Sequence, residues 1–280
     1  MKKYILLFTV FTLFATSCNK NDDPEIIKPN RITKITCTKN STPYFTADIS
    51  YHSVDGTISR IVTTDATIRY EYIGNTILES ITKNSESTAI NITHTTTQGV
   101  IKETTEQIEN PYYPNETYVK NQYTYHYERS QLKNTDWTYK WPKMDGDEKY
   151  GEDTTEGIDQ YTWSNGNITQ YKLLAQSIME YEYRAEVQPE NFPFRLLNTF
   201  TPVEFENFTP FNAYYGANNY NLPERAYWYN ILSANQNIGE YTFSYTGMGD
   251  YITGMTIVEN IAGESSNTYV YTFEYNYNPN

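Results

Sequence analysis

Apolar and polar residues alternate with a period of two in several stretches of the chain. Tyr123, Tyr125 and Tyr127 are separated by polar residues, and Tyr241 to Tyr245 and Tyr269 to Tyr277 continue the same pattern. Successive side chains of a β-strand point to opposite faces, so this pattern predicts antiparallel strands with one apolar and one wetter face. Tyrosine suits such strands because its ring can be buried while its hydroxyl reaches a polar partner.

Turn-forming dipeptides separate these runs, among them Asp55-Gly56, Gly74-Asn75, Asn165-Gly166 and Gly263-Glu264. They supply the positive φ angles that tight hairpins need. A loose repeat accompanies them, in which two apolar residues at i and i+2 are followed by a turn and an aliphatic residue. Its instances are Ile49/Tyr51 to Ile58, Tyr70/Tyr72 to Ile77, Tyr125/Tyr127 to Leu132, Tyr161/Trp163 to Ile168 and Phe243/Tyr245 to Ile252. The pattern predicts an all-β antiparallel meander of about ten to twelve strands that forms a strongly curved sheet or an open barrel.

Residues 187–230 differ from the rest of the predicted single all-β domain, residues 31–280. This segment contains five prolines and few alternating runs. We expect an irregular insertion that packs across the sheet or plugs the open end of a barrel, because so short a polar segment would bury too little to fold alone. Phe192 to Phe200 predicts one short helix with Phe194 and Leu197 on its apolar face.

The N-terminus has the pattern of a bacterial lipoprotein signal peptide, residues 1–17. Lys2 and Lys3 precede the apolar stretch Tyr4 to Phe14, and three small residues then lead to Cys18. The apolar stretch is too short to span a bilayer stably as a helix. The small residues before Cys18 resemble a lipobox, which implies lipidation of the Cys18 thiol, although Ala15 stands where the usual box has Leu. The alternative is an ordinary signal peptide with a chance cysteine.

Residues 18–30 form an acidic segment after this cysteine, with Asp22, Asp23 and Glu25 close together. The segment resembles the tether of surface-exported lipoproteins in Bacteroidetes, and the alternative is any solvated linker. The resemblance implies an outer-membrane lipoprotein exposed on the cell surface. Its membrane contact would be the N-terminal lipid alone.

Composition and charge exclude several classes. The chain has 280 residues, of which 29 are tyrosine, and its 34 acidic and 21 basic residues give a net charge of -13. Phosphate binding needs a cationic surface, so nucleic acid is not an expected partner. The abundance of strand formers excludes a mainly helical protein. With Cys18 assigned to lipid, Cys37 has no partner, and no intrachain disulfide is expected.

Candidate catalytic and metal sites are weak. Glu180 and Glu182 share one face of a predicted strand at about 7 Å, which inverting glycosidases tolerate, but such pairs are ordinary in strands. The acidic loop 145–153 lacks EF-hand spacing, so a solvated loop is favoured over a Ca²⁺ site. Thr154 follows an acidic residue in a pattern that resembles an O-glycosylation signal. The three histidines, His52, His94 and His126, show no ligand spacing. We therefore expect no enzyme activity, no metal and no cofactor.

A cluster of aromatic residues in the atypical segment is the best candidate binding site. It contains Tyr214, Tyr215, Tyr220, Tyr227, Trp228 and Tyr229. Exposed flat rings beside amides and carboxylates suit stacking on sugar rings. The alternative is that these rings cover the apolar end of the sheet, since large aromatic residues mostly fill cores.

The tyrosine–turn–aliphatic units resemble the YD repeats of bacterial surface proteins. With Cys18 and the acidic tether, they look more like a family of Bacteroidetes lipoproteins catalogued as a domain of unknown function with a porin-like, strongly curved antiparallel sheet. A second similarity is Tyr215-Gly216 followed by Asn219, Asn221, Leu222 and Pro223. The resemblance covers about residues 31–278. It implies a fold and a location, and no catalytic residues.

Taken together, these patterns predict an exported, lipid-anchored envelope protein that acts as a non-catalytic surface module and binds a glycan or a protein. The alternatives are a polysaccharide-active hydrolase and a structural envelope protein. A transmembrane barrel is disfavoured because many strand faces carry Thr, Ser and Glu, whereas lipid-facing positions should be apolar. The sequence leaves the oligomeric state and the ligand open.

Overall fold

The computed structural model describes residues 31–84, 89–109, 117–145, 149–173, 176–189, 192, 214–217, 219–233, 236–247 and 251–276. This part of the chain contains the strands β1 (Ile32–Lys39), β2 (Thr42–Tyr51), β3 (Ile58–Thr63), β4 (Ala66–Ile73), β5 (Thr76–Lys83), β6 (Ala89–Thr97), β7 (Val100–Glu109), β8 (Thr117–Glu128), β9 (Gln131–Asp145), β10 (Lys149–Ser164), β11 (Asn167–Leu173), β12 (Ser177–Val187), β13 (Asn221–Asn230), β14 (Gln236–Thr246), β15 (Gly254–Ile261) and β16 (Asn267–Tyr275). A 3₁₀ turn, η3 (Ile231–Ser233), follows β13.

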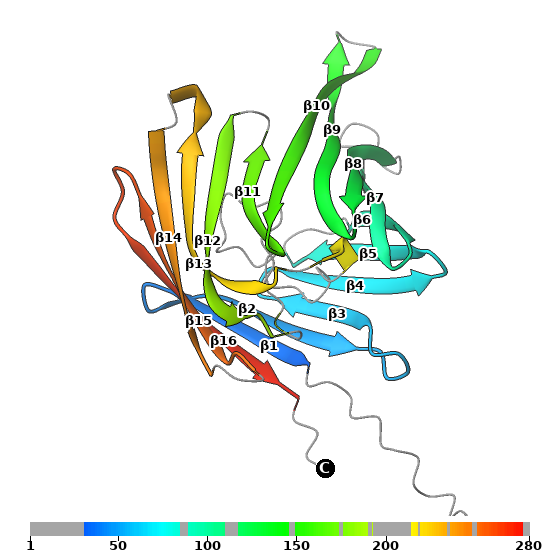
Figure 1. Cartoon of the computed structure of the whole chain (residues 1–280). Helices are drawn as coiled ribbons and strands as arrows, with labels where there is room; N and C mark the ends of the chain where they lie inside the picture. The colour runs from blue at the N-terminus through cyan, green and yellow to red at the C-terminus, as the bar shows by residue number, and fades with distance from the viewer. Residues whose placement is uncertain are drawn as a thin grey trace, which may run out of the picture.

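The strands form one closed antiparallel barrel (Figure 1). Each strand pairs with the next along the chain, and β1 closes the barrel by pairing with β16. The predicted all-β meander is confirmed, but sixteen described strands exceed the ten to twelve expected. Strands such as β7, with the sequence VIKETTEQIE, lack the aromatic alternation that marked the others. Such polar strands could not be recognised from aromatic alternation, and the sequence analysis therefore counted too few strands.

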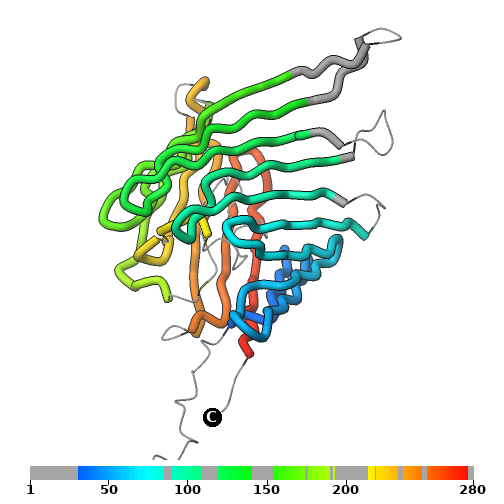
Figure 2. Tube along the Cα trace, turned by 90° about the vertical axis from the view of Figure 1, so that its right-hand side faces the viewer, coloured from blue at the N-terminus to red at the C-terminus, as the bar shows by residue number. Residues whose placement is uncertain are grey.

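The barrel wall differs in length around its circumference. β9 and β10 have 15 and 16 residues and pair along almost their full length. Figure 2 shows them beside β7 and β8 as one flaring sheet that projects beyond the shorter strands.

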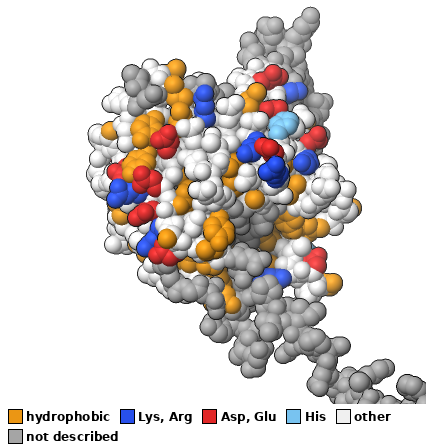
Figure 3. Space-filling model, in the orientation of Figure 1, with side chains coloured by type: hydrophobic (Ala, Val, Ile, Leu, Met, Phe, Trp, Pro, Cys, Tyr) orange, Lys and Arg blue, Asp and Glu red, His pale blue; other side chains and the backbone are white. Residues whose placement is uncertain are grey.

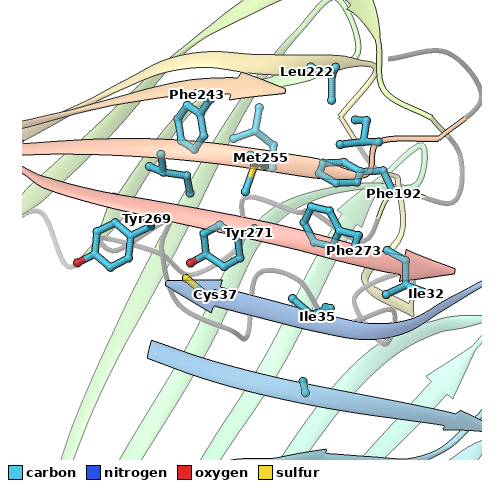
Figure 4. Packing of buried hydrophobic residues seen from close by; sticks show 14 of the residues in the cluster. Ile32, Ile35, Cys37, Phe192, Leu222, Phe243, Met255, Tyr269, Tyr271 and Phe273 are labelled. Carbon is cyan, nitrogen blue, oxygen red and sulfur yellow. The ribbon is translucent and has the colours of Figure 1, made fainter. Parts of the chain in front are cut away.

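Buried side chains occupy the inner face of the wall. In β16, Tyr269, Tyr271 and Phe273 are buried, whereas Val270 and Thr272 between them are exposed. Figure 4 shows these rings packed beside Ile35 and Cys37 of β1. The alternation predicted from the sequence therefore separates a hydrophobic interior from an outer wall rich in Thr, Ser, Glu and Lys.

The two ends of the barrel are distinct. β1 begins and β16 ends at one end, which we call the proximal rim, and the turns after the even-numbered strands lie there too. The opposite end is the distal rim. Because the wall is a continuous meander, every even-numbered strand runs towards the proximal rim.

Aromatic donors link neighbouring strands at the proximal rim. Near this end of an even-numbered strand, a tyrosine hydroxyl or an indole N–H donates a hydrogen bond to a carbonyl at the start of the preceding strand. These bonds run from Tyr51 to Ile32, Tyr127 to Ile101, Trp163 to Leu132, Tyr183 to Ile168, Tyr245 to Pro223 and Tyr275 to Ile252. The repeat seen in the sequence is therefore a packing device: the ring fills the interior, and its polar tip satisfies a backbone acceptor.

The predicted insertion contacts the proximal rim. The Ala217 amide donates to the Ser130 carbonyl in the β8–β9 turn, and the Tyr220 amide donates to the Gly166 carbonyl in the β10–β11 turn. The buried ring of Phe192 lies 5.4 Å from that of Phe273, nearly perpendicular to it. The remainder of the predicted helix Phe192 to Phe200 lies outside the described residues.

The irregular segment is shorter than expected, because Asn221–Asn230 forms strand β13. Pro223, one of the five prolines that marked residues 187–230 as irregular, lies within this strand. It is accommodated because the pairing of β12 with β13 shifts register between Glu182 and Tyr183, opposite Arg225 and Pro223. Prolines are tolerated at such irregularities, where no ladder hydrogen bond is lost.

Candidate functional site

The aromatic residues predicted to form one binding cluster lie in four different places. Tyr214 and Tyr215 pack against the barrel interior, where their ring centroids lie 6.1 Å from Tyr72 and 5.2 Å from Tyr125, respectively. Both are half-buried. These two rings therefore cover an end of the apolar core, which was the alternative to a binding site in the sequence analysis.

Tyr220 and Trp228 lie apart from that pair. Tyr220 is 59% exposed beside the β10–β11 turn, where its Cβ would lie 3.1 Å from a Cβ added at Gly166. Trp228 is half-buried on the inner face of β13, opposite Met179 of β12 and Gly239 of β14. The structure thus does not bring Tyr214, Tyr215, Tyr220 and Trp228 to one surface.

The outer face of β13 carries the two other tyrosines of the cluster. Tyr227 and Tyr229 are two residues apart on this strand, facing away from Trp228, and both are partly exposed. Tyr227 lies opposite Glu180 of β12 in the strand register, and Arg225 lies opposite Glu182. We call this set, Glu180, Glu182, Arg225, Tyr227 and Tyr229, the outer tyrosine face.

Hydrogen bonds connect the polar groups of the outer tyrosine face. The Tyr227 hydroxyl donates to Glu182 Oε2 at 3.3 Å and accepts from Arg225 Nη1 at 3.4 Å. Gln170 of β11 donates to Glu180 Oε1 at 3.1 Å. The face therefore presents both donors and acceptors around two aromatic rings. Figure 3 shows hydrophobic side chains interleaved with charged ones on the left of the view, where Figure 1 draws β12–β14.

The electrostatics of this face are acidic. Partial burial raises the pKa of Tyr229 above its usual value, and the nearby carboxylates Glu180, Glu182 and Glu240 raise it further. The hydrogen bond to Tyr227 raises the pKa of Arg225, so this guanidinium stays charged. A neutral or cationic ligand is therefore better matched to this face than an anion.

The carboxylate pair considered for hydrolysis belongs to the outer tyrosine face. Glu180 and Glu182 are both exposed on β12, and their partners are Gln170 and Tyr227, as described above. Glycosidases place their two carboxyl groups on either side of the scissile bond of a bound sugar. The position of the pair on an open wall agrees better with ligand contact than with acid catalysis.

The interior contains polar networks that the residue patterns did not identify. His94 of β6 is 2% exposed, and its ring nitrogens lie 2.8 Å from Thr104 Oγ1 and 3.0 Å from Glu79 Oε2. The Tyr70 hydroxyl donates to the other oxygen of Glu79 at 3.4 Å. Glu79 occupies the same face of β5 as the apolar Ile77 and Ile81. A charged residue on an otherwise apolar face was the feature of the sequence that could have revealed this network.

Asp159 of β10 is the centre of a second buried network. Trp137 Nε1 donates to its Oδ1 at 3.1 Å, and the Tyr171 hydroxyl donates to its Oδ2 at 3.0 Å. Burial raises the pKa of Asp159 to about 6, against the lowering effect of these two hydrogen bonds. Asp159 is two residues from Tyr161 and therefore lies on the same face of β10. Because Tyr161 was expected to be buried, this spacing could have indicated a carboxyl that points inward.

The remaining candidate residues lie apart from these networks. Cys37 is buried and unpaired, and burial raises the pKa of its thiol to about 11, which agrees with a structural role. Thr154 is exposed on β10. Cys18, Asp22, Asp23, Glu25 and residues 146–148 of the acidic loop lie outside the described residues.

The described residues contain no group of three or more His, Cys, Asp or Glu side chains placed to hold a metal ion. They also contain no helix with the length and apolar character needed to cross a membrane.

Comparisons with known proteins agree with the fold. The chain is similar to the crystal structure of a porin-like protein from Bacteroides uniformis ATCC 8492, with a TM-score of 0.56, 16% identity, and coverage of 87% of this chain and 97% of that one. A porin-like protein from Bacteroides vulgatus ATCC 8482 matches with a TM-score of 0.55 and 14% identity, over 88% of this chain and 99% of that one. At such identities the likeness concerns the fold alone. No curated protein matches the chain. A family model described as a domain of unknown function (DUF5032) matches residues 19–279, and the chain therefore belongs to this family.

Proposed function

We propose that the protein is a lipid-anchored envelope module that binds a glycan on the outer tyrosine face of its barrel. The observation that carries this proposal is the pair Tyr227 and Tyr229, displayed two residues apart on the outer face of β13 and flanked by Glu180 and Glu182. Pyranose rings present apolar faces that stack on flat aromatic rings, while their hydroxyls need donors and acceptors nearby. The outer tyrosine face offers both.

The acidic character of this face limits the class of glycan that it can bind. Three carboxylates lie near Tyr229, against the single guanidinium of Arg225. Uronic or sulfated glycans would be repelled, so a neutral or amino-bearing glycan is the expected class. The proposed role is binding without catalysis, so the glycan should dissociate chemically unchanged.

A glycan array with the full chain, purified in mild detergent, tests this function. We expect retained neutral glycans, and a loss of affinity of at least about fivefold for Tyr227→Ala and Tyr229→Ala, because a stacking ring contributes on the order of 1 kcal/mol or more. Tyr44→Ala is the matched control, because Tyr44 is a 47% exposed tyrosine on β2.

Two outcomes would contradict the proposal. Equal binding by all three variants would remove the outer tyrosine face as the site. Release of reducing sugar that disappears in Glu182→Gln would show the hydrolase alternative.

The location rests on the N-terminal signal and on Cys18. The residues from Cys18 to Arg31 would connect the lipid to the start of β1, and hence to the proximal rim. A tether of this length reaches about 40 Å when extended, so the barrel could stand clear of the bilayer. Cys18→Ser should move the protein from the membrane fraction to the soluble fraction, and a variant that still pellets with membranes in high salt would contradict lipid anchoring.

Replacing Asp22 and Asp23 with Ala should leave the protein facing the periplasm, where protease added to intact cells does not reach it.

A further inference from the structure

A second cluster of aromatic and acidic side chains lies on the inner face of β7–β9, away from the outer tyrosine face. The strand register places Glu106, Asn121 and Tyr139 in one row across these strands, and Tyr123 and Trp137 in the adjacent row. These five residues are called the inner-wall site. Asn121, Tyr123, Trp137 and Tyr139 lie towards the distal rim, because β8 starts and β9 ends there.

In the inner-wall site, the ring of Tyr139 is nearly perpendicular to the other two aromatic rings. Tyr139 is inclined at 80° to Tyr123, with ring centroids 6.4 Å apart, and at 79° to Trp137, with centroids 5.2 Å apart. Opposite Trp137 on β10 is Gly157, which contributes no side chain. The register sets these rings beside Glu106 and Asn121 on the inner face of the wall, and electron-rich aromatic rings beside a carboxylate favour an organic cation.

Hydrogen-bond acceptors complete the site. Asn121 is 5% exposed, and its amide nitrogen donates to Glu106. Its amide oxygen Oδ1 is buried and has no hydrogen-bond partner among the described residues. An unsatisfied buried acceptor destabilises the fold, and a donor supplied by a ligand would remove that cost.

A cation of the protein already lies at the edge of this site. Lys120 Nζ is 3.7 Å from Glu106 Oε1, and the Glu106 side chain is only 16% exposed. This separation is an ion pair, longer than a charge-assisted hydrogen bond. The Glu106 carboxylate therefore attracts an ammonium group and remains open to a closer one.

We propose that the inner-wall site binds a small organic ammonium compound, with its charge against Glu106 and the aromatic rings and its donor group on Asn121. The ligand would compete with Lys120 for Glu106. This site is separate from the proposed glycan-binding face and does not depend on it.

Choline and its uncharged isostere 3,3-dimethyl-1-butanol are the probes, titrated into the full chain by calorimetry in low salt. We expect choline to bind and the isostere to bind at least about tenfold more weakly, because only the cation gains from Glu106 and the rings. Glu106→Gln should weaken choline binding about tenfold. Lys120→Met should tighten it severalfold, because it removes the competing ammonium.

Matched control variants show whether these effects are specific to the inner-wall site. Glu103→Gln, at an exposed position of β7, should leave choline affinity unchanged. Thermal unfolding of each variant reports whether its fold is intact. Equal affinity for the two probes, unchanged binding in Glu106→Gln, or a loss of choline binding in Tyr227→Ala would each overturn the assignment to the inner-wall site.

Discussion

Asn167 and Asn221 hold each other by two hydrogen bonds at the proximal rim. Asn167 Nδ2 donates to Asn221 Oδ1 at 2.9 Å, and the backbone N–H of Asn221 donates to Asn167 Oδ1 at 2.8 Å. The two residues are 54 positions apart and begin β11 and β13, with β12 paired between those strands. The pair thus connects the end of the insertion to the barrel wall where the chain re-enters it.

Replacing Asn167 with Ala should destabilise the barrel by about 1–3 kcal/mol, because the Asn221 backbone N–H and Oδ1 would both lose their partner in a buried setting. Urea unfolding measures the change. Asn91→Ala is the control, since Asn91 is exposed in the middle of β6 and should cost less than about 0.5 kcal/mol. Equal effects of the two substitutions would contradict the role of the pair.

Tyr127→Phe tests the aromatic donors of the proximal rim. The ring would still fill the interior, but the Ile101 carbonyl would lose the hydroxyl that donates to it at 2.8 Å. We expect a loss of about 1–2 kcal/mol in the free energy of unfolding. Tyr44→Phe, at an exposed position, should change it little, and an unchanged stability in both variants would mean that water replaces the hydroxyl without cost.

Gly216→Ala tests the contact of the insertion with the wall. Gly216 has φ of +89°, and a Cβ there would lie 2.5 Å from the Ser130 carbonyl oxygen and 2.9 Å from Tyr127 Cε1. Gly74→Ala is the matched control, because Gly74 has φ of +59° and no neighbour within 4 Å of an added Cβ.

Backbone strain alone should cost about 1 kcal/mol at Gly74, and the clash should add about 1–3 kcal/mol at Gly216. Differential scanning calorimetry of the two variants gives the comparison. Similar melting temperatures of the two variants would show that the insertion moves away from the added methyl group without a loss of stability.

Asp159→Asn should change the pH dependence of stability. The folded chain holds the Asp159 pKa at about 6, above the ordinary value of 3.8, so folding favours the protonated carboxyl. The stability that this proton contributes is present below about pH 4 and is lost as pH rises through 6. The wild-type protein should therefore lose about 3 kcal/mol across this range relative to Asp159→Asn.

Denaturant unfolding at several pH values between 4 and 7 measures this difference. Asp48→Asn is the control, because Asp48 is exposed on the outer wall. Parallel pH profiles for the wild-type protein and Asp159→Asn would show that another group dominates this range.

Local chemistry in the sequence was enough to predict which side chains of a strand share a face. Tyr125 and Phe243 are buried, as their alternation indicated, because the period of two follows from the pleat of a single strand. The turn dipeptides likewise marked chain reversals, since positive φ depends on the residues of the turn itself, as at Gly56, Gly74 and Gly166. Strands β6 and β7 were harder to detect because polar side chains dominate their sequences.

Relationships between distant segments depended on the tertiary structure. Alternation separates Tyr227 from Trp228, but only closure of the barrel through β1 and β16 decides that Trp228 faces inward and Tyr227 outward. The partners of Asp159 and Asn121 depend on the register of neighbouring strands, which the sequence of one strand does not contain. The number of strands and the side chains that meet across the interior are therefore cooperative properties of the whole barrel, because each pairing is stable only when its neighbours bury the same face.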